Sequence, residues 1–203
     1  MGTPNLPPSP FYDPSRELAS LVDEYRGHGD LGRLLDGLKA LAKRTAPDVL
    51  KSAVAPYRDI PEVVIPIFER ITADSPTDAQ AIVVLANAYW LAGRGPSHVE
   101  QLANRAKSLD PNNRGAWHLW ALAESDLRKR VGRWQAVTAQ FPADQLARAA
   151  LADNATSLAT DEDDPVALGL AIETYETLLN EATHTAQRMA LEQSLTALKK
   201  ARG

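Results

Sequence analysis

The sequence repeats itself with a period of about 34 residues, and this repeat limits the folds that the chain can adopt. Apolar, aromatic, glycine and proline positions recur when the sequence is compared with itself. At an offset of 64, Leu18, Leu21, Tyr25 and Gly29 fall on Ile82, Leu85, Tyr89 and Gly93; at an offset of 35, Ile82, Leu85 and Ala86 fall on Trp117, Trp120 and Ala121; and at an offset of 31, Ala103 and Pro111 fall on Trp134 and Pro142. A unit this short cannot bury its apolar face alone, so neighbouring units have to stack.

The periodicity inside one unit predicts two amphipathic helices joined by a tight turn. In the first unit, apolar residues recur at spacings of three and four on one face, at Leu18, Leu21, Val22 and Tyr25. Glycines interrupt this pattern, and a second helical stripe of leucines follows between residues 31 and 41. Pro47-Asp48 then ends the second helix and begins the next one. The apolar composition leans on alanine and leucine, which favour helix.

Five units of this kind can be drawn, at about 15–48, 49–78, 79–113, 114–144 and 145–183. They predict three regions along the chain. Residues 1–14 contain five of the fourteen prolines and are expected to form an extended arm. Residues 15–183 form the repeat domain, and residues 184–203 supply a C-terminal capping helix, at about 185–201, whose polar outer face closes the stack.

The third unit, residues 79–113, resembles the tetratricopeptide repeat (TPR) family. Its first helix shows a bulky residue, a leucine, a small residue and a tyrosine at the family's spacing, and its second ends in a proline; the matching residues are Ile82, Leu85, Ala86, Tyr89, Gly93, Val99, Ala103, Ala106, Leu109 and Pro111. This resemblance implies an all-α fold, a right-handed α-solenoid of antiparallel helix hairpins.

In the TPR family the first helix of each unit lines a concave groove, so the resemblance also implies a binding surface. Side chains of these helices that lie off the packing face are the candidate site: Val83, Asn87, Trp90, Leu91, His118, Leu122 and Asp126, with Asp153 and Ser157 in the fifth unit. Trp90 follows the packing residue Tyr89, so it is either a groove anchor or it packs beneath the N-terminal arm or an adjacent helix. Trp117, Trp120 and Trp134 occupy core spacings and are predicted to be structural.

The candidate groove favours an apolar or amphipathic partner segment over an acidic one. Some TPR proteins clamp a peptide carboxylate with lysine and asparagine side chains, and Asn87 matches one of those positions. The positions that need cations hold Ala19, Val83, His118 and Leu122 instead. A charge clamp requires cations next to the carboxylate, so we expect the groove to bind through apolar contacts.

Composition and motifs argue against most other classes of function. The net charge is −4, which does not favour nucleic acid, and no stretch approaches the length of about 20 apolar residues that spans a membrane. The chain has no cysteine, and its four histidines stand alone, so no metal site and no cofactor are expected. The acidic run 161–164 is expected to start a helix, with Asp164 as the N-cap and Pro165 at the first position. Phosphate-binding and nucleophile motifs are absent.

These observations lead to one preferred function and three alternatives. The preferred function is a non-enzymatic scaffold that binds a protein or peptide partner in the cytoplasm, as the lack of cysteine and of a secretory signal favours. The first alternative is a structural subunit or a self-assembling homo-oligomer that uses the groove and the N-terminal arm. A sensor of small molecules or regulatory peptides comes next, and an enzyme comes last.

Overall fold

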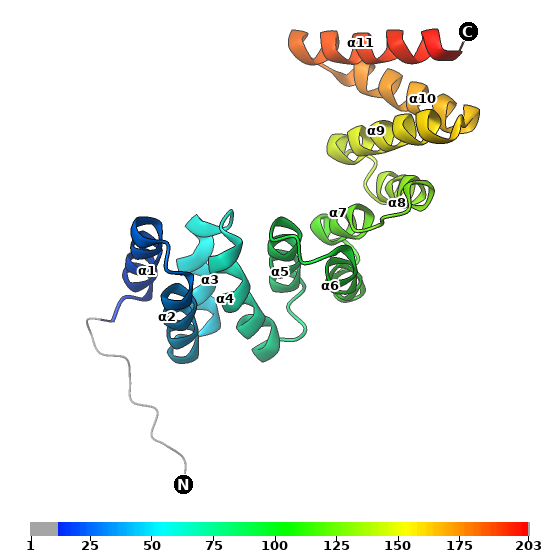
Figure 1. Ribbon diagram of the computed structural model, residues 1–203. Coiled ribbons are helices and arrows are strands. Elements are labelled where there is room, and N and C mark those ends of the chain that lie inside the picture. The colour runs from blue at the N-terminus through cyan, green and yellow to red at the C-terminus, as the bar shows by residue number, and fades with distance from the viewer. Residues whose placement is uncertain (1–11, 203) are drawn as a thin grey trace. The chain divides into compact units, whose positions relative to one another are not determined.

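The computed structural model of the protein describes residues 12–202, and within this range the chain is all-α. The helices are α1 (Pro14–His28), α2 (Leu31–Arg44), α3 (Pro47–Val54), α4 (Pro61–Asp74), α5 (Ala79–Leu91), α6 (Pro96–Leu109), α7 (Arg114–Leu122), α8 (Leu127–Gln140), α9 (Gln145–Glu162), α10 (Pro165–Glu181) and α11 (Thr185–Arg202), with a 3₁₀ turn at Ala55–Tyr57 (Figure 1). The all-α prediction and the predicted helix hairpins are confirmed. Most of the predicted N-terminal arm, residues 1–11, lies outside the described residues.

The repeat is punctuated by one four-residue turn that occurs three times. Each turn leads from the second helix of one hairpin to the first helix of the next, at 75–78, 110–113 and 141–144. In each, the backbone N–H of the fourth residue donates to the carbonyl of the first, over 3.1, 3.1 and 3.0 Å. The second residue is always proline, whose fixed φ suits this position of a β-turn; the prolines are Pro76, Pro111 and Pro142.

The last residue of each turn is also the N-cap of the next helix. Asp78, Asn113 and Asp144 accept hydrogen bonds through their side chains from backbone N–H groups of α5, α7 and α9. Such a cap satisfies a donor that the first helical turn leaves without a partner. Asp164 caps α10 in the same way and Pro165 is its first residue, as the sequence predicts.

The helices belong to two compact units, residues 1–98 and 99–203. In the first unit, α4 is the central helix and packs against α2, α3 and α5. Val63, Val64, Ile67, Phe68 and Ile71 of α4 are buried. Pro61 begins this helix and Pro66 lies inside it, so both prolines belong to the second helix of their hairpin.

Gly37 lets α1 and α2 approach closely within the first unit. A Cβ atom at this position would lie 2.4 Å from the Cδ2 atom of Leu21, well inside van der Waals contact. The absence of a side chain therefore allows the leucine of α1 to rest on the backbone of α2.

The core of the second unit is built around Trp134 of α8 and a set of small residues. Trp134 is 2% exposed, and it packs in one cluster with alanines that include Ala121, Ala147 and Ala155. α8 packs against α7 and α9, and α10 packs against α9 and α11. No helix among the described residues is long and apolar enough to cross a membrane.

Candidate functional site

The face of α5 that points away from the core of the first unit carries an apolar stripe. Val83, Asn87, Trp90 and Leu91 lie on this face, and we call them the α5 stripe. Trp90 is 41% exposed and Leu91 is 53% exposed. The opposite face of the same helix, with Ile82, Leu85 and Ala86, is buried, so the two faces of α5 differ in their exposure.

Tyr89, next to Trp90, is held by polar contacts within the first unit. Its hydroxyl donates a hydrogen bond to Glu69 Oε1 over 2.7 Å, and the ring of His98 lies edge-on to it. Burial and the Glu69 carboxylate raise the pKa of Tyr89 to about 12. Tyr89 thus occupies the packing position, and Trp90 is turned away from it.

The three candidate residues from α7 and its following turn lie in different surroundings. His118 is half-buried, and its Nε2 atom lies 2.7 Å from Asp144 Oδ2. Asp126 is the N-cap of α8 and accepts a hydrogen bond from the backbone N–H of Lys129 over 2.8 Å. Leu122, the last residue of α7, is 37% exposed. Of the three, only Leu122 offers apolar surface without a structural role of this kind.

Asp144 connects the first helices of two neighbouring hairpins. Its side chain is 2% exposed and caps α9. The same carboxylate contacts His118, and the Nε atom of Arg114 lies 3.7 Å from it. Burial alone would raise the pKa of Asp144, but the hydrogen bonds from His118 and the backbone N–H of Ala147 outweigh it, and the pKa lies below its ordinary value.

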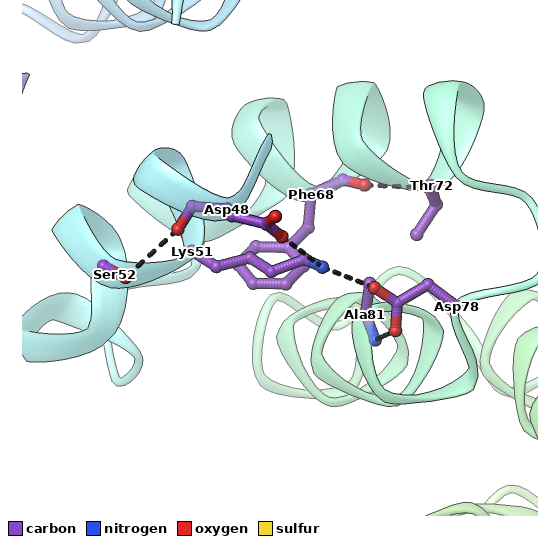
Figure 2. Close-up of polar contacts among 7 residues, drawn as sticks. All are labelled: Asp48, Lys51, Ser52, Phe68, Thr72, Asp78 and Ala81. Carbon is purple, nitrogen blue, oxygen red and sulfur yellow. Dashed lines mark hydrogen bonds and ion pairs between the residues drawn. The ribbon is translucent and has the colours of Figure 1, made fainter. Parts of the chain in front are cut away.

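The first unit contains an equivalent contact. Lys51 Nζ lies 2.6 Å from Oδ2 of Asp78, the N-cap of α5. Figure 2 shows this ion pair between Lys51 and Asp78. Lys51 and His118 are each the fifth residue of their helices, α3 and α7. We call these two contacts the inter-hairpin cap pairs. Burial opposes ionisation of Asp78 too, yet Lys51 and the backbone N–H of Ala81 hold its pKa below the ordinary value.

Two of the three tryptophans that the sequence assigns to the core are only half-buried. Trp117 and Trp120 meet edge to face, and the Lys107 ammonium lies 3.9 and 3.3 Å from their ring centroids. The guanidinium of Arg133 lies 4.9 Å from the Trp120 ring and pairs with Glu100 and Glu124. Burial and the nearby Arg133 charge lower the pKa of Lys107. These side chains join α6, α7 and α8.

A groove in the second unit runs over α10, between α9 and α11. It encloses about 340 Å³, and we call it the α10 groove. Its apolar lining includes Leu146, Ala149, Leu178, Ala190 and Leu191, and its polar lining includes Asp153, Tyr175 and Ser194. Leu146 is 70% exposed. The sequence pointed to Asp153 but not to the leucines, because they belong to three helices that only the fold brings together.

Tyr175 should titrate well above an ordinary tyrosine. It is buried, and its hydroxyl donates to Asp153 Oδ1 over 2.5 Å. Burial and this hydrogen bond raise the pKa of Tyr175 to about 12. The absorbance of ionised tyrosine, followed as the pH is raised, measures this pKa, and the part of the signal that Tyr175→Phe lacks belongs to Tyr175. We expect that part to have its midpoint near 12, and we expect Asp153→Asn to lower the midpoint. A midpoint near the ordinary value of about 10 would contradict the contact.

No group of three or more histidine, aspartate and glutamate side chains in the described part of the chain could hold a metal ion. The groups with shifted pKa values lie in helix caps, ion pairs, aromatic contacts and, for Tyr175, a hydrogen bond to Asp153. At a catalytic site such groups typically converge on one cleft, whereas the groups described here are spread over many helices.

Comparison with known proteins defines the fold. No protein-family model and no curated protein matches the sequence. Among solved structures, two crystal structures of MamA match with TM-scores of 0.55 and 0.57 at 17% and 16% identity, over 78% and 85% of this chain and 96% and 97% of theirs. TTC0263, a thermophilic TPR protein of Thermus thermophilus, matches with a TM-score of 0.54 at 17% identity, over 91% of this chain and 98% of its own. The chain therefore has a TPR-like helical-repeat fold.

Proposed function

We propose that this protein is a non-enzymatic interaction scaffold that binds an apolar or amphipathic segment of a partner protein, and that it works in the cytoplasm. The observation that carries the proposal is the α5 stripe, where Trp90 and Leu91 are exposed side by side on a helix whose other face is buried. Exposed aromatic and aliphatic side chains of this kind are typical anchors of protein interfaces.

The charge of the chain agrees with a protein partner. A net charge of −4 does not favour nucleic acid as the partner. Lys51, a cation on the first helix of its hairpin, is already paired with Asp78 and Asp48. An apolar contact at Trp90 therefore explains recognition better than capture of an acidic group.

Trp90→Ala should weaken partner binding at least about tenfold, because a buried interface tryptophan commonly contributes more than about 1.4 kcal/mol. A photo-crosslinking residue at Asn87, in the middle of the α5 stripe, would identify the partner in cells, and isothermal titration with the purified partner would measure the loss. Leu109→Ala is the matched control, since Leu109 is also 41% exposed but ends α6. Equal affinities of Trp90→Ala and the unaltered protein would refute the role of the stripe.

Self-assembly is the competing function. One face of α11 argues against self-assembly. Met189 is the one large apolar side chain among the residues described on this face, which include Glu192, Gln193, Thr196 and Lys200. Such a face suits a polar cap better than an interface between copies. Light scattering across a wide range of concentrations separates the two functions, and a mass that rises with concentration would favour self-assembly.

A further inference from the structure

The α10 groove is bounded by side chains of three helices, α9, α10 and α11. α10 packs against both α9 and α11 and separates them, as Figure 1 shows. Leu146 and Ala149 of α9 form one wall, Ala190 and Leu191 of α11 form the other, and Leu178 forms part of the floor. Apolar side chains thus cover both sides of the groove.

The described lining of the groove contains a single charged side chain, which is negative. Asp153 lies seven residues, or about 10 Å along the helix axis, from Leu146. One of its carboxylate oxygens accepts a hydrogen bond from the hydroxyl of Tyr175, and Asp153 is in none of the ion pairs between described residues. Nearby charges are already paired, since Arg148 binds Glu181 over 2.5 and 2.8 Å and Arg188 binds carbonyl groups at the end of α10.

The hydrogen bond from Tyr175 positions the Asp153 carboxylate to bind a cation. The hydroxyl holds one oxygen of Asp153 in place and leaves the second oxygen open to a charged donor. A lysine or arginine that reached it would form a charge-assisted hydrogen bond beside apolar surface, where such bonds are stronger than in water.

We propose that the α10 groove binds an amphipathic helix of the partner protein, with an apolar side chain against Leu146 and a lysine or arginine two turns away on Asp153. This inference rests on the proposed scaffold function and adds the chemistry of the partner. The charges are arranged in the opposite way to those of a carboxylate clamp, in which the scaffold supplies the cations. Here the scaffold supplies the negative charge and the partner supplies the positive one.

The test uses the full chain and two synthetic helical peptides of about 18 residues. Both peptides have a central leucine on an apolar stripe. One carries lysine seven residues before and after this leucine, so that it can bind in either direction, and the other carries glutamine at both places. We expect the lysine peptide to bind about tenfold more tightly by isothermal titration, with a preference that falls as salt is added.

Two charge-matched variants decide whether Asp153 causes the preference. Asp153→Asn removes one negative charge from the groove, and Glu173→Gln removes one from the exposed surface of α10 outside the groove lining. We expect Asp153→Asn to abolish the preference for lysine, and Glu173→Gln to keep it. Leu146→Ser should weaken the binding of both peptides, since it removes the exposed apolar side chain from one wall of the groove.

Three results would overturn the inference: equal binding of the two peptides, a lysine preference that persists in Asp153→Asn, or no binding of either peptide. None of them would decide the proposed function, which is tested at Trp90 in the other unit. If the natural partner still depends on Trp90, the scaffold function stands and only the groove is excluded as a contact.

Discussion

Replacing Trp134 with alanine is expected to lower the free energy of unfolding by about 3–5 kcal/mol. The side chain is 2% exposed and lies in the core shared by α8, α9 and α10, with the His118 ring edge-on at 5.2 Å. The substitution removes the largest buried side chain of the second unit and leaves a cavity that the surrounding alanines cannot fill. Urea unfolding followed by circular dichroism measures the loss, and hydrogen exchange should locate it in residues 99–203.

Two further variants control for size and position. Trp134→Phe should cost less than Trp134→Ala, because it keeps an aromatic ring and removes an indole N–H that is buried without a hydrogen-bond partner among the described residues. Trp90→Ala makes the same truncation at a 41% exposed site and should cost less than about 1 kcal/mol. If Trp134→Ala proved as mild as Trp90→Ala, the packing described for the second unit would be wrong.

Replacing Asp144 with alanine should cost about 2–3 kcal/mol, because one change removes two functions. The cap of α9 is lost, which typically costs about 1 kcal/mol, and the half-buried His118 loses its hydrogen-bond partner. Asp144→Asn separates these contributions, since asparagine caps a helix well but carries no charge. Its expected loss is roughly half as large, and thermal or urea unfolding of the three proteins measures both steps.

The dependence on pH follows from the direction of the shift. Because the folded pKa of Asp144 lies below its unfolded value of about 3.9, the ionised carboxylate stabilises the protein above that value. This stabilisation is lost as the pH falls through the folded pKa. The difference in unfolding free energy between the unaltered protein and Asp144→Asn should therefore be full at about pH 7 and shrink below about pH 4. A difference that stayed constant down to about pH 3 would contradict the charge interaction.

Much of the fold could be predicted because the punctuation of the chain is local. Prolines 76, 111 and 142 recur one unit apart, and each precedes an aspartate or asparagine by two residues. The predicted third, fourth and fifth units accordingly begin at the first residues of α5, α7 and α9.

The site was harder to predict because it depends on contacts between units of the repeat. Trp117 and Trp120 have core spacing, but Lys107 and Arg133 cover their rings in place of apolar side chains. His118 was expected to face the groove, whereas its side chain contacts Asp144. Because Asp144 lies 26 residues further along the chain, helical spacing within one repeat does not reveal this contact. The equivalent contact of Lys51 with Asp78, 27 residues apart, is a signal that a comparison of the units could have revealed. Asp126 was assigned to the groove because its role as an N-cap was not recognised.

The inter-hairpin cap pairs have a consequence for how the protein unfolds. Each carboxylate caps the first helix of one hairpin and also binds Lys51 or His118 of the hairpin before it. One hairpin of such a pair therefore cannot melt without uncapping or unpairing its neighbour. In a one-dimensional description of repeat proteins, these contacts are coupling energies between adjacent sites. Fraying should then advance in blocks of two hairpins, and amide protons on both sides of a pair should exchange with one common free energy.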